Sequence, residues 1–358
     1  MKLNTLEVNL DNFLYNLSSI KKYIGDKNIM PIFKANAYGT YLNKILDVLN
    51  IFDIVGVASV DEAIEIRKTG YDKDIFVLNQ PSIEDINDIL DYDIVVGISE
   101  ISFIKSLSDI SKNIRVHIEI ETGMNRTGIK LDNLDDYISI IKNNHNIIVE
   151  GIYTHLSSAD NDIDYTNMQI EKFHLSVEKI KNNFDTIKYI HSCASNGIIN
   201  YNDDICNLVR PGIILYGYES YNGALDKIKI KPVTQLKTKI NFLKKVNIGE
   251  SISYSRTYIS DDVKTIATIP IGYADGLRRE LSNKGYVVVK GKKVKIVGNV
   301  CMDSCMIDVS DIDNVSIGTD VYIWDNDIQT LEDIAKLCNT INYEIMCNIS
   351  YRVNRVFK

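Results

Sequence analysis

The chain has 358 residues, of which 45% are hydrophobic and 25% are charged. This composition is ordinary for a globular protein, and the length suits one large barrel or two domains. The net charge of −8 gives no general attraction for nucleic acid, so we expect no nucleic-acid partner. No apolar run reaches the ~18 residues of a membrane span, and the N-terminus lacks the apolar stretch of a secretory signal. We therefore expect a cytoplasmic protein that has no membrane partner.

Six cysteines are scattered along the chain, and none of them forms a CxxC pair. Cys301 and Cys305 lie in an alternating apolar stretch, where both would face the same side of a strand. Free buried thiols are the favoured interpretation and a zinc site is the minor alternative. We therefore expect no metal.

From residue 29 to about residue 215, short apolar runs alternate with amphipathic segments. The segment Leu42–Leu49 has helical spacing, and Ser59–Gly70 is typical of a helix with a serine N-cap and a glycine stop. Eight parallel strands with intervening helices close a TIM barrel, which we predict for residues 1–228. The predicted strands are Ile29–Phe33, Ile54–Ala58, Ile75–Asn79, Ile94–Ile98, Ile114–Ile120, Ile148–Thr154, Ile187–His191, and Leu208 with the following Ile213–Tyr216.

Beyond about residue 230 the pattern changes to strands separated by turn formers. We predict a mostly β C-terminal domain over residues 229–358, with which the first residues of the chain could pair. Only Leu331–Leu337 has helical spacing there. The predicted strands are Val233–Val246, Val263–Pro270, Tyr286–Val289, Lys293–Val300, Met302–Val309 and Val321–Trp324.

Polar residues follow the predicted barrel strands, at the end where barrel enzymes carry their functional groups. Lys34 ends the first strand, where partial desolvation would favour a neutral amine for Schiff-base chemistry. The other residues of this rim offer the cations, hydroxyls and backbone turn that a phosphate on an aromatic aldehyde needs. They are Tyr38, Glu119, Glu121, Arg126, His155, His191, Ser195, Asn196, Arg210, Gly212 and Ile213.

Each of these residues also has a structural interpretation. His155 could be a satisfied core histidine, Arg126 a helix-end cap and Arg210 a surface ion-pair partner. Their joint position at strand ends favours a functional site. In the second domain, Tyr254 and Tyr273 lie beside serine, glycine and turn residues, although a tyrosine is more often a packing residue with a wet tip.

The segment Lys34–Gly39, Lys-Ala-Asn-Ala-Tyr-Gly, resembles the cofactor-lysine signature of the alanine racemases. These are pyridoxal-phosphate enzymes built from a TIM barrel and a β-domain. Four further blocks are similar to that family in the same order, so the resemblance covers essentially the whole chain. The blocks are Arg210–Gly217, Ile271–Gly276, Gly298–Asp303 and Ile349–Val353.

The resemblance implies that the cofactor is pyridoxal 5'-phosphate, held covalently by Lys34, with Arg210 facing its pyridine nitrogen. It also implies a homodimer with shared active sites, in which Tyr254 of the partner subunit is the second acid/base. His155 would hydrogen-bond that tyrosine. The residues implied to hold the phosphate are Tyr38, Ser195, Gly212, Ile213 and Tyr351.

For the amino-acid substrate, the resemblance implies that Arg126 and the backbone of the partner subunit's Met302 bind the carboxylate. Asp303 would support the loop that carries Met302. Tyr273 and Tyr351 would narrow the entrance to the site.

The sequence departs from the family pattern in three segments. Thr40 and Tyr41 replace the usual His-Gly after the signature, and Ala194 replaces an asparagine near the cofactor, which predicts lower cofactor affinity. Glu119 occupies a position where many relatives carry a lysine that becomes carbamylated and supports the substrate-binding arginine. A glutamate supplies the negative charge directly, so we expect Glu119 to orient Arg126 without a carbon dioxide adduct.

The expected function is the interconversion of L-alanine and D-alanine by two bases, Lys34 and Tyr254, which supplies D-alanine for peptidoglycan. One alternative is a serine racemase of the same fold, against which the bulky Tyr351 argues. Another is a pyridoxal-phosphate-binding protein without turnover, which gives no reason for a second domain bearing Tyr254. The sequence leaves open the preference between alanine and serine, and a biosynthetic or a germination role.

Overall fold

The computed structural model describes residues 3–201, 203–218, 223 and 226–358. The chain divides into two compact units, which meet in sequence near the expected domain boundary at residue 228. The barrel unit comprises Tyr15–Ala37 and Tyr41–Ile230, and the β unit comprises Met1–Leu14, Tyr38–Thr40 and Lys231–Lys358. Within the described ranges, no helix combines the length and the apolar character needed to cross a bilayer.

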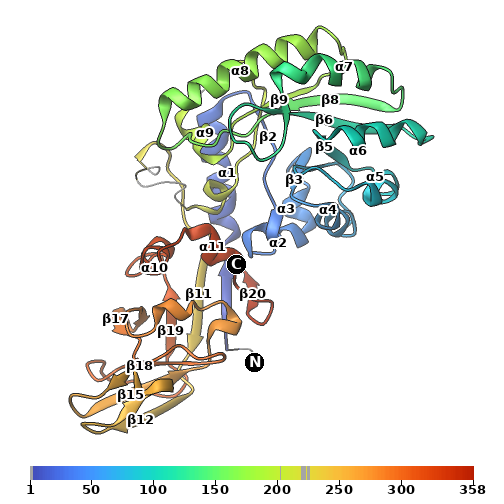
Figure 1. Ribbon diagram of the computed structural model, residues 1–358. Helices are drawn as coiled ribbons and strands as arrows, with labels where there is room; N and C mark the ends of the chain where they lie inside the picture. Colours follow the sequence, from blue (N-terminus) through green and yellow to red (C-terminus); the bar gives the residue numbers. More distant parts are fainter. Residues whose placement is uncertain (1–2, 202, 219–222, 224–225) are drawn as a thin grey trace. The chain divides into compact units, whose positions relative to one another are not determined.

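The barrel unit contains a ring of parallel strands (Figure 1). Six strands pair in the order β3-β4-β5-β6-β8-β9, and β2 pairs with β10. Isolated parallel bridges between Ile32 and Gly56 and between Ala194 and Arg210 join the two groups and close the barrel. The predicted fold is therefore confirmed. The strands are β2 (Asn28–Ile29), β3 (Ile54–Val57), β4 (Asp74–Val77), β5 (Val95–Ile98), β6 (Ile114–Glu121), β8 (Ile147–Tyr153), β9 (Tyr189–His191) and β10 (Leu208–Val209).

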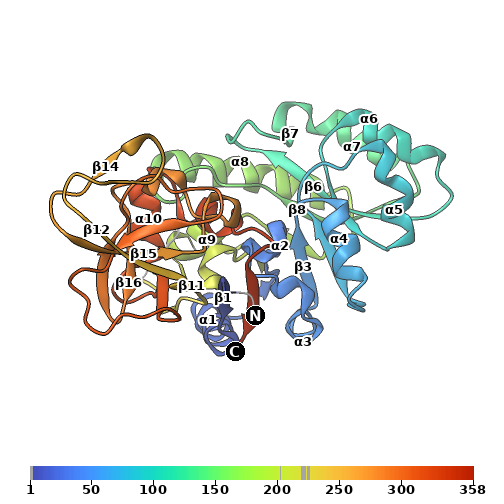
Figure 2. The ribbon, with the colours of Figure 1, turned by 90° about the horizontal axis from the view of Figure 1, so that it is seen from below.

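Helices follow most of these strands and lie outside them (Figure 2). The predicted N-cap of α4 is confirmed, because the Ser59 side chain accepts from the Glu62 amide. The predicted helical segment at Leu42–Leu49 forms two short helices, η1 (Leu42–Lys44) and α3 (Leu46–Leu49). The other α-helices before residue 201 are α1 (Leu10–Ile24), α2 (Lys34–Tyr38), α4 (Val60–Arg67), α5 (Ile86–Asp91), α6 (Ile101–Ser106), α7 (Leu134–Lys142), α8 (Ile163–Lys181) and α9 (Ser195–Asn200), and the short strand β7 (Ile129–Lys130) pairs with β6.

The prediction of a strand at Ile213–Tyr216 is wrong, because this segment is the 3₁₀ helix η5 (Ile213–Tyr216). Gly212 has φ −107° and ψ −106°, which turns the chain out of the extended conformation after β10. All four residues of η5 are buried. A short apolar run predicts burial in either conformation, so the pattern could not distinguish the two.

The barrel interior combines large rings with glycines on neighbouring strands. His117 on β6 is the direct cross-strand partner of Gly151 on β8. A Cβ atom at Gly151 would lie 2.6 Å from the His117 ring, and one at Gly97 would lie 2.2 Å from the Tyr153 hydroxyl. These glycines therefore provide the space in which interior side chains interdigitate.

The β unit is built on a six-stranded sheet in the order β17-β16-β19-β11-β1-β20. Its N-terminal strand, β1 (Thr5–Val8), lies between β11 (Thr234–Lys239) and β20 (Asn354–Phe357). The other strands of this sheet are β16 (Tyr286–Val289), β17 (Lys292–Lys295) and β19 (Asp320–Trp324). A smaller sheet contains β12 (Phe242–Val246), β15 (Lys264–Ile269) and β18 (Cys305–Asp308), and β13 (Ser251–Ile252) pairs with β14 (Tyr258–Ile259).

Helix α10 (Leu331–Leu337) has the predicted bounds, whereas α11 (Asn342–Cys347) was not predicted. All six cysteines are free. The prediction that Cys301 and Cys305 share one strand is wrong, because only Cys305 lies in β18 and Cys301 belongs to the preceding loop.

Substitution of Gly151 by alanine should lower the free energy of unfolding by about 1–3 kcal/mol, since a buried ring has little freedom to move away from the new methyl group. Urea unfolding followed by circular dichroism measures this loss. The double variant Gly151→Ala/His117→Ala should lose less than the sum of the two single variants, because removing the ring relieves the clash. Wild-type stability of Gly151→Ala would contradict the packing described above.

Candidate active site

The turn that carries Lys34 is left-handed. Four consecutive residues, Ala35 to Tyr38, have φ values between 52° and 55°, a conformation that costs roughly 1–2 kcal/mol per non-glycine residue. Glu62 supports the turn: its carboxylate accepts from the backbone N–H groups of Ala35 (2.7 Å) and Ala58 (2.8 Å). Lys34 itself is exposed, so the expected partial desolvation of its amine is not met within the single chain.

Arg210 is the central cation of the barrel unit and is 1% exposed. Its Nη1 donates to Nδ1 of His191 (2.6 Å) and to the His191 carbonyl (2.9 Å). Its Nη2 donates to the carbonyls of Thr154 (2.8 Å) and Ser192 (2.9 Å), and lies 3.4 Å from Nδ1 of His155. Its Nε is buried and has no hydrogen-bond partner in the described part of the chain. One N–H donor of a buried guanidinium is thus left for an acceptor from outside the chain.

Three histidines lie close to this cation and are held neutral. Burial, followed by the charge of Arg210, lowers the pKa of His155 to about 3 and the pKa of His191 well below its ordinary value. His117 contacts His191 through its Nδ1 atom (2.8 Å), and burial and nearby cations lower its pKa to about 3. At neutral pH each of these imidazoles therefore has one donor and one acceptor nitrogen.

Arg126, Glu119 and His155 line one small cavity of about 10 Å³ at the ends of β6 and β8. Glu119 is 4% exposed, and its Oε1 accepts from the Thr127 hydroxyl at 2.8 Å. No hydrogen bond or ion pair joins Glu119 to Arg126, although both are described. Burial raises the pKa of Glu119, while the Thr127 hydrogen bond and the charge of Arg126 oppose that rise. Glu119 is thus hydrogen-bonded to the residue after Arg126.

The ends of β9 and β10 meet at Ser195 and Gly212. Ser195 is the first residue of α9, is 5% exposed, and accepts from the Gly212 N–H at 3.1 Å. Gly212 and Ile213 are buried. The predicted Tyr38 belongs by its contacts to the β unit, where its buried ring lies 6.0 Å from that of Tyr343 and burial raises its pKa. The structure thus brings Ser195, Gly212 and Ile213 together, and places Tyr38 in the other unit.

In the β unit, hydrogen bonds tie together the loops that carry the remaining predicted residues. The N–H groups of Tyr273 and Ala274 donate to the carbonyls of Cys301 and Met302, both at 3.0 Å. Arg352 links two of these loops, through Asp303 (2.7 Å) and Asp275 (3.4 Å). The Tyr254 carbonyl accepts from Asn299 at 2.9 Å. Four large side chains are exposed on these loops: Tyr254, Tyr273, Met302 and Tyr351.

Sequence reasoning missed four residues of these networks. Glu62 and Arg352 stood inside quoted motifs, so their charge was a usable signal. His117 is a polar residue within a predicted apolar strand, which is a signal of a buried partner. Thr127 gave no signal, because its contact with Glu119 depends on the path of the loop.

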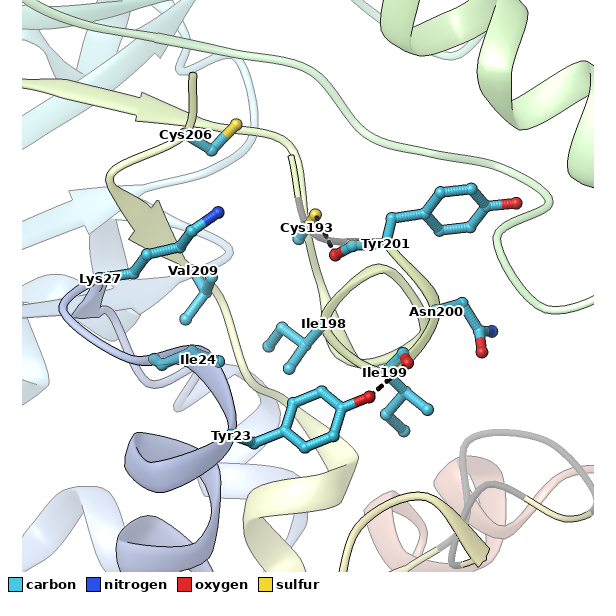
Figure 3. A pocket seen from close by; sticks show the side chains of 10 residues that line it. All are labelled: Tyr23, Ile24, Lys27, Cys193, Ile198, Ile199, Asn200, Tyr201, Cys206 and Val209. Carbon is cyan, nitrogen blue, oxygen red and sulfur yellow. Dashed lines mark hydrogen bonds between the residues drawn. The ribbon is translucent and has the colours of Figure 1, made fainter. Parts of the chain in front are cut away.

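A larger open cavity, of about 290 Å³, lies elsewhere in the barrel unit (Figure 3). Its lining includes Tyr23, Lys27 and Cys193, and the Tyr23 hydroxyl donates to the Ile199 carbonyl at 2.8 Å. None of the predicted site residues lines it. Among the residues placed by the structure, no group of three or more histidine, cysteine or acidic side chains could hold a metal ion.

Two family models match the chain. "Alanine racemase, N-terminal domain" matches residues 8–220, and "Alanine racemase, C-terminal domain" matches residues 233–357. Curated relatives include "Alanine racemase 2" of Caldanaerobacter subterraneus subsp. tengcongensis, 36% identical over 98% of this chain and 94% of the relative. The "Alanine racemase" of Clostridium kluyveri is 37% identical over 98% of this chain and 93% of the relative.

Solved structures agree with this match. The alanine racemase of Clostridium difficile 630 superposes with a TM-score of 0.94 at 32% identity, covering 100% of this chain and 96% of that one. The alanine racemase of Bacillus anthracis with bound L-Ala-P gives 0.92 at 31% identity, covering 100% and 95%. On both its sequence and its fold, the chain belongs to the alanine racemase family.

Proposed function

We propose that this protein interconverts L-alanine and D-alanine with pyridoxal 5'-phosphate bound at the strand ends of the barrel unit. The observation that carries the proposal is the buried Nε–H of Arg210, which has no partner in the described part of the chain and belongs to the same unit as Lys34. A pyridine nitrogen is an acceptor that fits this donor. Bound pyridoxal phosphate supplies a conjugated ring that takes up the electron pair left when the Cα proton is removed.

Arg210 would keep that ring nitrogen unprotonated. A guanidinium has only donors and keeps its proton, so the nitrogen it faces remains an acceptor. The carbonyls of Thr154, His191 and Ser192 fix the plane of the guanidinium from two strand ends. This arrangement supports a weak electron sink, which would limit side reactions such as transamination.

The phosphate would be held by Ser195 and by the backbone of Gly212 and Ile213, with Tyr38 and Tyr351 as further ligands. The Gly212 N–H donates to Ser195 Oγ at 3.1 Å, which fixes the serine beside this turn and leaves its hydroxyl hydrogen to donate to a phosphate oxygen. The substrate carboxylate would be bound by Arg126, whose side chain is exposed beside His155, together with the backbone of the partner subunit's Met302.

Racemisation needs a proton removed from one face of Cα and a proton delivered to the other face. Lys34 would hold the cofactor and move the proton on one face, and Tyr254 of the partner subunit would move it on the other. His155 would hydrogen-bond this tyrosine through the imidazole nitrogen that does not face Arg210.

A homodimer with shared sites would bring these two residues together. Tyr254, Met302 and Tyr351 are 71%, 53% and 81% exposed in the single chain, on loops fixed by Arg352 and Asn299. Tyr273 and Tyr351 would narrow the entrance, and Asp303 would support the Met302 loop through Arg352. Large exposed side chains on ordered loops support a protein interface at this edge of the β unit.

We further propose that the product D-alanine is used for peptidoglycan.

Tyr351 favours alanine over serine, because a bulky phenol near the substrate methyl leaves little space for a hydroxymethyl group. The racemisation rates of L-alanine and L-serine compare the two substrates directly. If the protein exchanges no Cα proton of either amino acid, the alternative of a protein that only binds the cofactor is favoured.

Lys34→Ala should abolish both racemisation and the cofactor absorption band that borohydride removes, because no other amine would hold the cofactor. Absorption spectra before and after borohydride treatment measure this loss. Lys44→Ala is a matched control, since Lys44 is a nearby lysine paired with Glu65, and it should keep the band. A band of wild-type intensity in Lys34→Ala would refute the cofactor assignment.

Tyr254→Phe should impair proton transfer from one enantiomer by at least about a hundredfold while sparing the other, since the ring is kept and only the hydroxyl is lost. Deuterium incorporation at Cα from L-alanine and from D-alanine in heavy water measures the two directions. Tyr258→Phe, on neighbouring β14, should change neither. An equal loss in both directions would argue against a tyrosine that serves one face.

Glu119→Leu should raise the KM for alanine about threefold to tenfold, because the Thr127 hydroxyl beside Arg126 loses its acceptor. Glu119→Gln keeps an oxygen that can accept from Thr127, and should stay within about twofold of wild type. Initial rates over a range of alanine concentrations provide the test. If Glu119→Gln is as impaired as Glu119→Leu, the negative charge itself orients Arg126.

A further inference from the structure

A chain of three polar side chains crosses the interior of the barrel unit. Arg210 Nη1 lies 2.6 Å from His191 Nδ1, and His191 Nε2 lies 2.8 Å from His117 Nδ1. Both histidines are 0% exposed. His117 Nε2 has no hydrogen-bond partner within the described ranges, so the chain ends there.

Arg210 determines which nitrogen of each histidine in this hydrogen-bonded series carries the hydrogen. A guanidinium can only donate, so His191 Nδ1 must be an acceptor. Neutral His191 therefore carries its hydrogen on Nε2 and donates it to His117 Nδ1. His117 in turn carries its hydrogen on Nε2, because neutral imidazole has one hydrogen.

The surrounding rings keep both imidazoles in place. His117 stacks on Phe76 with ring centroids 4.4 Å apart, and it occupies the space left by Gly151. His191 stacks on Tyr153 at 5.2 Å with an interplanar angle of 5°. Because both rings are packed in this way, neither imidazole can rotate to bring a different acceptor to the His191 Nε2 hydrogen.

The cost of this arrangement is a buried N–H without a partner at its far end. Such a group destabilises a fold, and an apolar ring at position 117 would avoid it. A cost to stability is typical of residues kept for function. The acceptor nitrogen of His117 is therefore the useful part of this side chain.

We propose that His117 is a positioning residue for Arg210. Its Nδ1 accepts the hydrogen of His191 Nε2, which leaves His191 Nδ1 free to accept from Arg210 and turns the Nε–H of the guanidinium toward the cofactor. This inference rests on the proposed function for the identity of the cofactor. Its first step, the control of the His191 tautomer, is independent of any cofactor.

Loss of the acceptor has two possible results, and both disturb Arg210. If His191 keeps its hydrogen on Nε2, that donor is buried without a partner. If the hydrogen moves to Nδ1, a donor then faces the Nη1 donor of Arg210, and the guanidinium must shift. An unpaired buried donor corresponds to about 5- to 150-fold in an equilibrium constant.

Two substitutions separate the acceptor from the ring. His117→Phe keeps a ring that can stack on Phe76 and removes the acceptor. His117→Asn loses the ring, but its Oδ1 lies near the place of Nδ1 and can accept from His191. Phe76→Leu is the matched control, since it disturbs the packing of His117 and leaves the hydrogen-bond chain intact.

The first measurement is the tautomer of His191, from long-range proton–nitrogen spectra of the full-length protein. Wild type, His117→Asn and Phe76→Leu should show the hydrogen on Nε2, and His117→Phe should show it wholly or partly on Nδ1. The second is the dissociation constant for pyridoxal phosphate. It should rise at least tenfold in His117→Phe and stay within about threefold in the other two variants.

The proposal is overturned if wild-type His191 carries its hydrogen on Nδ1, a result that needs no variant to fold. It is also overturned if His117→Phe folds and binds pyridoxal phosphate as tightly as wild type. A wild-type protein that does not bind this cofactor would instead refute the proposed function, while the tautomers would still test the step from His117 to His191.

Discussion

Arg210 is a cation buried in the barrel, and the rest of the candidate site is arranged around it. Removing a guanidinium from water is costly unless its donors are paired. Carbonyl oxygens at the ends of β8 and β9 pair with most of them, and these carbonyls cannot move without disturbing the strands. The same contacts that stabilise the cation therefore fix its plane and leave its Nε–H without a partner among the described residues.

Burial and the charge of Arg210 together keep the nearby histidines neutral. Burial and this charge both disfavour protonation of His155 and His191. Neutral imidazoles can accept as well as donate, which a protonated imidazole cannot do. Because Arg210 only donates, it fixes which nitrogen of His191 accepts, and the hydrogen bond from His191 then fixes which nitrogen of His117 accepts.

Several polar atoms around this site lack partners in the described part of the chain. They include Arg210 Nε, His117 Nε2 and Glu119 Oε2, all of them buried. The left-handed turn after Lys34 adds backbone strain. Each feature lowers stability, which fits a site that is organised for a ligand at some cost to the fold.

The apolar periodicity of the sequence predicted most of the barrel strands, because burial on both faces leaves a continuous run that local reading detects. It failed at Ile213–Tyr216, where a buried 3₁₀ turn has the same apolar composition as a buried strand. It also gave only a general indication that the first residues could pair with the second domain. The pairing of β1 with β11 and β20 joins segments from opposite ends of the chain, so no local pattern specifies it.

The family, the barrel and the identity of the residues at its rim could be predicted from the amino-acid sequence, because these depend on local spacing and on motifs of consecutive residues. Which atoms are in contact became known only from the three-dimensional structure. His117 and His191 are 74 residues apart, and Glu119 accepts its hydrogen bond from Thr127, the residue after Arg126. Such contacts depend on strand register and loop path at a precision of about an ångström, to which hydrophobic spacing is insensitive.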